Sequence, residues 1–140
     1  MIRKFNISDA NFCADIFSQT LDVWTESEII KSAESPAFLG FVDEEDGKIV
    51  AVGLFSFIFD EAEILNIATD KDYKRQKRAE NILFTAFNQL KENGVKKVFL
   101  EVRESNAPAI SLYNKLGFER FFERKNYYGN ETALILKKEF

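Results

Sequence analysis

The chain has 140 residues, 46% of them hydrophobic and 30% charged, which is the composition of an ordinary globular protein. At this length we expect a single domain over residues 1–140. The formal net charge of −4 argues against direct nucleic-acid binding, and a chain with no His and one Cys lacks the residues of the usual metal sites, His-based triads and internal disulfides.

No stretch of the sequence has the pattern of a signal peptide or a membrane span. The longest nearly apolar stretch, residues 49–59, is much shorter than the roughly 20 residues that a spanning helix needs. We therefore expect a cytoplasmic protein without a membrane partner. The 15 Phe residues predict an aromatic core. Cys13 lies between Phe12 and Ile16 in a helical pattern and is interpreted as a small buried hydrophobic residue.

The first elements are a strand and two helices. Residues 2–7 alternate weakly as a strand and lead to Ser8-Asp9, a predicted cap for a helix with apolar residues on one face. A Thr-x-x-Glu capping box at residues 25–28 predicts a second helix that reaches about residue 33.

A hairpin and an interior strand are predicted next. The apolar stretches at residues 38–42 and 49–59 are separated by a loop with an Asp-Gly pair, which favours a tight turn between antiparallel strands. Residues 63–69 continue the sheet. They carry apolar side chains on both faces, which is typical of a strand inside a sheet.

The second half of the chain contains a strand-helix-strand unit. Apolar residues recur at spacings of three and four from residue 79 up to an Asn-Gly helix end at 93–94. Residues 95–103 return to a strand, which we expect to run parallel to residues 63–69. Asn106 caps a further helix, and residues 118–124 and 132–138 alternate as a final antiparallel hairpin.

A basic loop precedes the long helix. Lys74, Arg75, Lys77 and Arg78 place four positive charges within five positions, in a chain that is otherwise acidic. Cations are unfavourable beside the positive end of a helix dipole unless an anion binds there. The loop is therefore either a phosphate-binding site that uses helix amides and basic side chains, or a solvated run of charges.

Two residues near this unit could exchange protons. Glu101 lies in an apolar strand, where partial desolvation would make its carboxylate a stronger base, although an edge strand would let it point to water. Tyr113 lies three residues after Ile110 and three before Leu116. This spacing also suits a tyrosine of the core, yet a phenol stays protonated at pH 7 and could return a proton to a leaving thiolate.

Several motifs together resemble the GNAT superfamily of N-acetyltransferases. They are Glu-Ile-Leu-Asn-Ile-Ala-Thr-Asp from Glu63, Tyr-Lys-Arg-Gln-Lys-Arg-Ala from Tyr73, Leu-Glu-Val-Arg-Glu-Ser-Asn-Ala-Pro-Ala-Ile from Leu100, Leu-Tyr-Asn-Lys-Leu-Gly-Phe from Leu112 and Arg-Lys-Asn-Tyr-Tyr from Arg124. Within the superfamily they look most like the bacterial ribosomal-protein alanine N-acetyltransferases. The segment Trp-Thr-Glu-Ser before the second helix is similar to the family's acceptor-side segment.

The resemblance implies the GNAT fold, an α/β (α+β) arrangement with a mixed sheet of six or seven strands, about four helices and a splayed parallel strand pair that holds acetyl-CoA. It implies no metal and direct attack of an amine on the thioester, with Glu101 as the base and Tyr113 as the acid. The residues that it assigns to acetyl-CoA are Ile67, Ala68 and Thr69 for the pantetheine arm, Arg75, Gln76, Lys77, Arg78, Ala79 and Glu80 for the pyrophosphate, and Asn106 for the other side of the arm.

Lys77 departs from the family pattern, which has Gly at the centre of the phosphate loop. Its side chain could block the close approach of a phosphate or could pair with it. The resemblance implies acetylation of a protein N-terminal amine, with a ribosomal protein as a candidate partner and a monomer or weak dimer as the working form. Small-molecule amines, polyamines, lysine side chains and a non-catalytic CoA sensor are alternatives. Tyr127 and Tyr128 either line the acceptor groove or pack in the hairpin.

Overall fold

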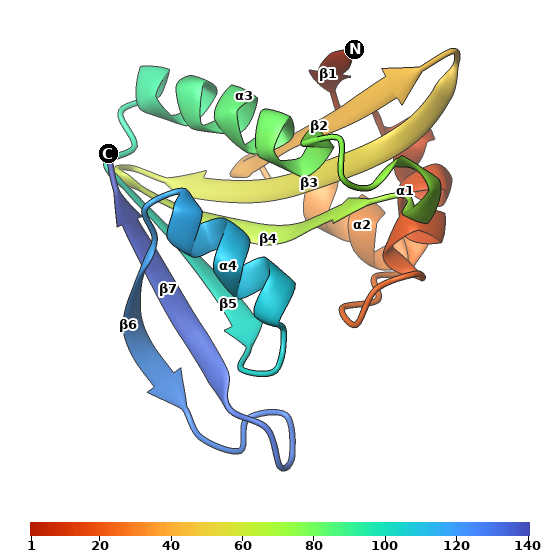
Figure 1. Cartoon of the computed structure of the whole chain (residues 1–140). Helices are drawn as coiled ribbons and strands as arrows, with labels where there is room; N and C mark the ends of the chain where they lie inside the picture. Colours follow the sequence, from red (N-terminus) through yellow and green to blue (C-terminus); the bar gives the residue numbers. More distant parts are fainter.

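The structure is a computed structural model that describes residues 1–140, and it contains a mixed sheet with the strand order β1-β2-β3-β4-β5-β7-β6 (Figure 1). All neighbouring strands are antiparallel except β4 and β5, which are parallel as predicted. The strands are β1 (Ile2–Lys4), β2 (Phe38–Glu45), β3 (Lys48–Ile58), β4 (Glu61–Thr69), β5 (Lys97–Arg103), β6 (Glu119–Arg124) and β7 (Ala133–Glu139).

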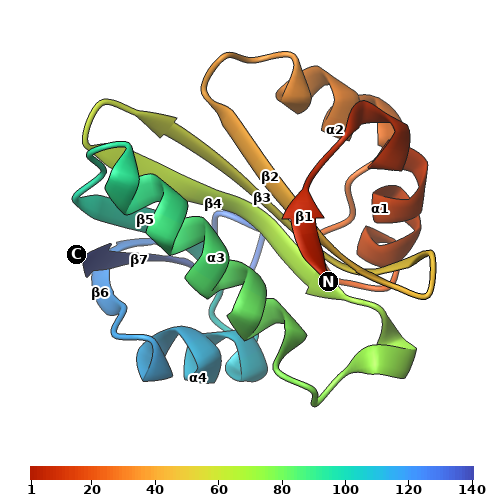
Figure 2. The same ribbon diagram turned by 90° about the horizontal axis from the view of Figure 1, so that it is seen from above.

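Helices cover both faces of the sheet (Figure 2). One face carries α3 and α4, which pack on the larger core cluster, and the other carries α1 and α2, which pack on the smaller one. No helix is both long enough and apolar enough to cross a bilayer. The helices are α1 (Ala10–Phe17), α2 (Glu26–Ala33), α3 (Arg78–Glu92) and α4 (Ala107–Lys115), with short 3-10 turns η1 (Ile7–Asp9) and η2 (Lys71–Tyr73).

The local signals for turns and caps hold in most places. Asp46 and Gly47 both have positive φ angles, 51° and 79°, as the predicted turn between β2 and β3 requires. Thr25 accepts a hydrogen bond from the Glu28 amide at 3.2 Å, which is one half of the predicted capping box of α2. Asn106 accepts from the Ala109 amide at 3.3 Å and caps α4.

The predicted cap at Ser8-Asp9 is wrong in detail. Asp9 precedes α1, but its carboxylate does not cap that helix. It accepts hydrogen bonds from the Asn6 amide at 2.7 Å and from the Arg3 guanidinium at 2.9 Å. The carboxylate therefore fastens β1 to the start of α1, and β1 ends at Lys4, before the predicted strand end at residue 7.

A β-bulge interrupts the regular alternation of side chains in β4. Leu54 pairs with Asn66 and Phe55 with Ile64, so Leu65 has no partner and the alternation of side chains shifts at this point. Ile64 and Ile67 pack with the cluster under α3 and α4, whereas Leu65 packs with the cluster under α1 and α2. The strand is interior, as predicted, and the bulge lies where it leaves β5.

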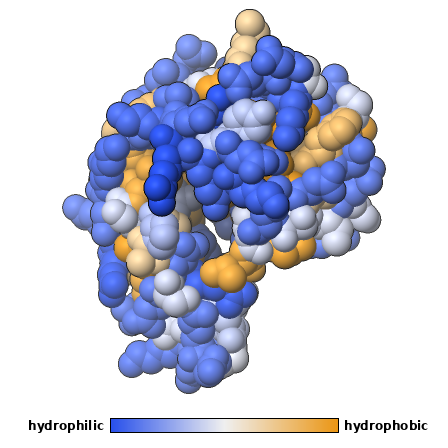
Figure 3. Space-filling view, turned by 45° about the vertical axis from the view of Figure 1, so that its right-hand side comes forward, coloured by the Kyte–Doolittle hydropathy of each residue, from blue (hydrophilic) through white to orange (hydrophobic).

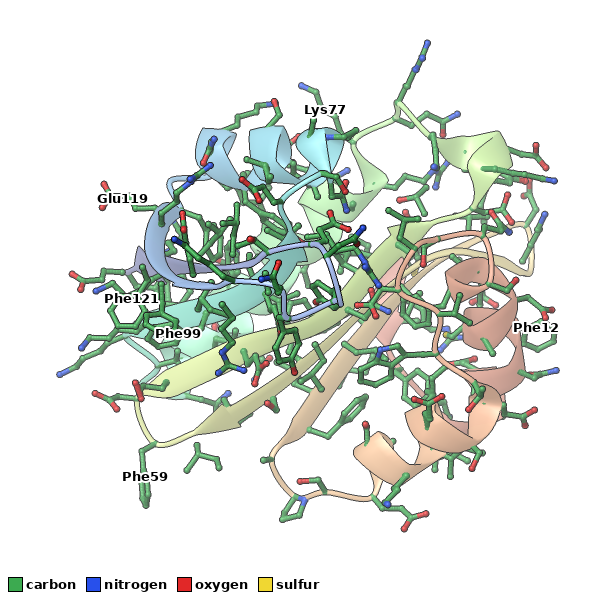
Figure 4. All side chains as sticks on the ribbon, turned by 90° about the horizontal axis from the view of Figure 1, so that it is seen from below. Phe12, Phe59, Lys77, Phe99, Glu119 and Phe121 are labelled. Atoms are coloured by element: carbon green, nitrogen blue, oxygen red, sulfur yellow. The ribbon has the colours of Figure 1, made fainter.

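The phenylalanines do not form the aromatic core that their number predicts. Only five are buried, namely Phe17, Phe41, Phe55, Phe87 and Phe118. Several others lie at the surface, and Figure 4 shows Phe12 and Phe59 pointing outward. Phe99 and Phe121 lie against one another with ring centroids 5.5 Å apart. Aliphatic side chains fill most of the core instead. Cys13 is fully buried, as expected.

The functional cleft arises where β4 and β5 separate. Their parallel pairing covers only four residue pairs, from Glu61 with Lys97 to Ile64 with Leu100. Beyond Ile64 the strands diverge toward their carboxyl ends (Figure 1). A wedge-shaped opening therefore lies at the centre of the sheet. The backbone groups of β4 and β5 that face this opening have no neighbouring strand.

Candidate active site

A cleft of about 680 Å³ occupies the opening between β4 and β5. Residues of both strands line it, together with residues of the loop before α3, of α4 and of the loop after α1. Figure 3 shows a hollow between the two halves of the molecule, with hydrophilic residues around its mouth. Of the twelve site residues named from the sequence, all except Gln76 line this cleft.

The loop before α3 forms a cradle of free backbone amides. Arg75 and Lys77 have positive φ angles, 65° and 58°, and Lys77 is the N-cap of α3 without a capping side chain. No acceptor within the chain bonds to the amides of Arg78, Ala79 or Glu80. Amides that converge in this way at a helix start bind anions, so the loop fits a pyrophosphate group.

Lys77 adopts the left-handed conformation that Gly would hold at this position. Its side chain is exposed, and in Figure 4 it lies at the surface beside the start of α3. The backbone can therefore approach a ligand as it would with Gly, while the ammonium group stays at the mouth of the cleft.

The Arg78 side chain is committed to the protein. Its Nη1 lies 3.1 Å from Asp43 Oδ2 and its Nη2 lies 2.8 Å from Glu45 Oε2. Its Nε donates to Gln76 at 2.9 Å, and the guanidinium carbon lies 5.2 Å from the centre of the Tyr73 ring. These contacts secure the loop to β2 and explain why Gln76 lies outside the cleft. Only the backbone of Arg78 is left for a ligand.

Glu80 is buried at the first turn of α3. A carboxylate there would repel a phosphate, but Lys115 of α4 lies 3.2 Å from it and compensates its charge. This ion pair connects the helices on the two sides of the cleft.

The bulge in β4 places Asn66 beside the backbone groups assigned to the pantetheine arm. Asn66 Oδ1 accepts a hydrogen bond from the Ile67 amide at 2.9 Å, and its Nδ2 donates to the Asp22 carbonyl at 2.9 Å. A donor molecule that pairs with the Ile67 amide must displace Asn66. The same side chain holds the loop after α1 against the cleft.

Glu101 and Tyr113 reach the cleft from opposite faces of β5. Tyr113, on α4, is 94% buried against Phe118, and its hydroxyl makes no hydrogen bond within the chain. Burial raises the pKa of this phenol, so it stays protonated over the physiological range. The structure thus places a protonated phenol without a hydrogen-bond partner among the residues that line the cleft.

At the other end of the cleft, Glu101 meets Tyr128. The Tyr128 hydroxyl donates to Glu101 Oε1 at 3.2 Å, and the guanidinium of Arg103 stacks on the Tyr128 ring with its carbon 3.9 Å from the ring centre. Tyr127 packs edge-on against Tyr128 but is exposed and does not line the cleft. Tyr128 therefore lines the cleft, whereas Tyr127 packs against Tyr128 in the hairpin.

Two further carboxyl groups lie near Glu101. Burial, together with the charge of Glu101, raises the pKa of both Asp22 and Glu63. Asp22 belongs to the loop after α1 and was missed from the sequence because no pattern marks that loop. Arg103 was also missed, although its spacing of two from Glu101 in a strand places both on one face.

A splayed parallel strand pair, a cradle of free amides, a carboxylate and a phenol in one cleft are the features of an acyltransferase that acts on amines. Residues 9–118 match the Acetyltransferase (GNAT) family. The chain belongs to the GNAT family of N-acetyltransferases, as the sequence motifs indicated, and acetyl-CoA is the acyl donor of this family.

Individual relatives agree with this assignment. The chain is 38% identical over 117 residues to the ribosomal protein bS18-alanine N-acetyltransferase of Escherichia coli strain K12. The aligned region covers 81% of this chain and 78% of the relative. It is 35% identical over 112 residues to the enzyme of the same name from Haemophilus influenzae, with 76% of each chain covered. The crystal structure of the ribosomal-protein-S18-alanine N-acetyltransferase from Escherichia coli superposes with a TM-score of 0.91 at 33% identity, covering 99% of this chain and 92% of the other.

Proposed function

We propose that the enzyme acetylates the α-amine of a protein N-terminus, and that its acceptor is a ribosomal protein that begins with alanine, modified in the cytoplasm. The observation that carries the proposal is that Glu101 and Tyr113 line one cleft from opposite faces of β5. The names of the relatives support the choice of acceptor.

The residues of the cleft divide the work of binding. The free amides at the start of α3 hold the pyrophosphate, and exposed Lys77 adds positive charge at the mouth. Ile67, Ala68 and Thr69 on β4 and Asn106 before α4 border the arm of the donor. When bound, acetyl-CoA supplies an acetyl group activated as a thioester.

The proton transfers follow from the two side chains. An N-terminal amine has a pKa near 8, so about one-tenth of it is neutral at pH 7 and a single carboxylate is an adequate base. Glu101 takes the proton that the nitrogen loses as the N–C bond forms. Tyr113 gives its proton to the sulfur as the C–S bond breaks.

The one cysteine of the chain cannot carry an acyl group. Cys13 is the only cysteine, and it is buried under α1 on the face opposite α3 and α4. Burial raises the pKa of its thiol to about 12, which keeps it protonated and unreactive. Direct attack of the amine on the thioester, which the resemblance to the GNAT family implies, needs no such thiol.

A small cationic amine is a second candidate acceptor. Asp22 and Glu63 lie beside Glu101, and a polyamine would be attracted by this set of carboxyl groups.

The test incubates the protein with acetyl-CoA and one of three acceptors: alanine-starting peptides, lysine peptides with blocked N-termini, or polyamines. Thiol release and product mass are followed, and the alanine peptide with an acetylated N-terminus is the matched control. We expect thiol release with the free alanine peptide and none with the control.

Faster turnover of polyamines or blocked lysine peptides would replace the proposed acceptor. Binding of CoA without thiol release for any acceptor would indicate a sensor. Full activity of Glu101→Gln would remove Glu101 from the role of base.

A further inference from the structure

The loop between β6 and β7 is fastened to the end of β5 by one carboxylate. Glu131 Oε1 accepts hydrogen bonds from the amide of Ser105, at 3.0 Å, and from its hydroxyl, while Glu131 Oε2 lies 3.5 Å from Arg103 Nη1. The Glu131 carbonyl also accepts from the Tyr128 amide at 3.1 Å. Glu131 thus connects the turn before α4 with the loop that carries Tyr128.

Tyr128 lies between this attachment and the base. Arg103, which pairs with Glu131, stacks on one face of the Tyr128 ring, and the Tyr128 hydroxyl reaches Glu101 Oε1. Burial and the charge of Glu101 raise the pKa of Tyr128 to about 12, so the hydroxyl keeps its proton and remains a donor. Glu101 Oε2 has no hydrogen-bond partner in the chain.

We propose that Tyr128 is a positioning residue that fixes the Glu101 carboxylate so that Oε2 faces the amine, and that Glu131 sets the place of Tyr128 through Arg103 and the loop backbone. The inference rests on the proposed role of Glu101 as base. It assigns a function in the reaction to the ion pair between Arg103, which lines the cleft, and Glu131, which does not.

The charges around Glu101 make such a restraint necessary. Asp22 from the loop after α1 and Glu63 from β4 both repel the carboxylate, while Arg103, two residues along β5, puts a positive charge on the same face of the strand. A carboxylate among unequal charges would rotate toward Arg103 without a further partner. The Tyr128 hydroxyl offers one directed hydrogen bond that holds Oε1 and leaves Oε2 free.

The central test is Tyr128→Phe, which removes the hydroxyl and keeps the ring under Arg103. We expect kcat to fall about tenfold, the value of one lost hydrogen bond. The acidic limb of the kcat/KM profile should move to higher pH, because the charged form of the base loses a donor. The KM for acetyl-CoA should stay the same. Tyr127→Phe is the matched control and should change none of these quantities.

The second test is a double-mutant cycle with Glu131→Gln, which keeps the shape of the side chain and removes its charge. Glu131→Gln should shift the acidic limb in the same direction as Tyr128→Phe, and the double variant should be no slower than Tyr128→Phe alone. Independent, multiplying losses in kcat would overturn the link from Glu131 to Tyr128.

Two results would overturn the role of Tyr128 itself. One is an unmoved acidic limb with a change only in the KM for the peptide, which would indicate a simple acceptor contact. The other is full kcat in Tyr128→Phe while Glu101→Gln loses activity, which would leave the base in place but remove its positioning residue. Full activity of Glu101→Gln would contradict the proposed function instead.

Discussion

At the scale of single residues, the proposed proton donor, Tyr113, is distinguished by a hydroxyl without a hydrogen-bond partner. Tyr113 is buried with its hydroxyl directed to the cleft, and no group of the chain bonds to that hydroxyl. A tyrosine that served only the core would use its hydroxyl in a hydrogen bond. Periodicity in the sequence shows the apolar side of α4 but cannot show this missing partner, so the sequence left both interpretations of Tyr113 open.

Tyr113→Phe should separate activity from stability. We expect kcat to fall about 100-fold, as for loss of a general acid, because the leaving thiolate would lose the phenol proposed to protonate it. The free energy of unfolding should stay within about 0.5 kcal/mol of wild type, because no hydrogen bond is lost. Steady-state kinetics and urea unfolding measure the two quantities. A parallel loss of both, or full activity, would contradict the assigned role.

At the scale of elements, the regular spacing of apolar residues predicted helices and strands well. Local interruptions of that spacing could not be predicted. The helices and the final hairpin follow from apolar spacing and capping residues. The faces of β4 could not be predicted, because a bulge at Leu65 shifts every later side chain and no residue type marks it. Asn66 was a usable signal, as a polar residue inside an apolar strand. Asp9 was misassigned because its partner, Arg3, lies on another element.

The loop before α3 allows a matched pair of substitutions. Arg78→Leu should lower the free energy of unfolding by about 1–3 kcal/mol, because it leaves buried Asp43 without one of its ion-pair partners. Lys77→Gly should change stability by less than about 1 kcal/mol, because relief of the left-handed conformation is offset by greater freedom of the unfolded chain.

Binding of CoA should respond in the opposite order. Lys77→Gly should weaken affinity by about two- to fivefold at low salt and reduce its dependence on ionic strength, because an exposed charge at the mouth is lost. Arg78→Leu should leave the salt dependence unchanged. Calorimetric titration at two salt concentrations measures both effects. An equal salt dependence for Lys77→Gly and wild type would remove Lys77 from phosphate binding.

At the scale of the whole molecule, an ion pair adds to the pairing of β1 with β2 and connects β1 to the start of α1. Arg3 hydrogen-bonds the nearly buried Asp9 and holds the pKa of that carboxyl below its usual value. A lowered pKa in the folded state contributes stability above about pH 4, the unfolded value for Asp, and this contribution is lost as pH falls through the folded pKa.

Asp9→Asn should therefore be less stable than wild type at pH 7, and the difference should shrink below about pH 4. Urea unfolding at a series of pH values measures it. Asp15→Asn is the control, since Asp15 is exposed on α1, the helix that Asp9 precedes, and its carboxylate has no ion-pair partner. A difference that is constant with pH would indicate that the loss comes from the change of shape and not from the charge.

The short junction between β4 and β5 divides the machinery unequally. The proposed base, acid and positioning residue, Glu101, Tyr113 and Tyr128, all belong to the half that runs from β5 to β7, whereas the amide cradle proposed for the pyrophosphate belongs to the half that ends with α3. Four parallel residue pairs and the core beneath them join the halves, and the Glu80–Lys115 ion pair crosses between them. A hinge motion at this junction would change the distance from the cradle to the acid and base while their mutual spacing stayed fixed. In this fold, the groups proposed to hold the pyrophosphate can therefore move as one unit relative to the groups proposed to transfer protons.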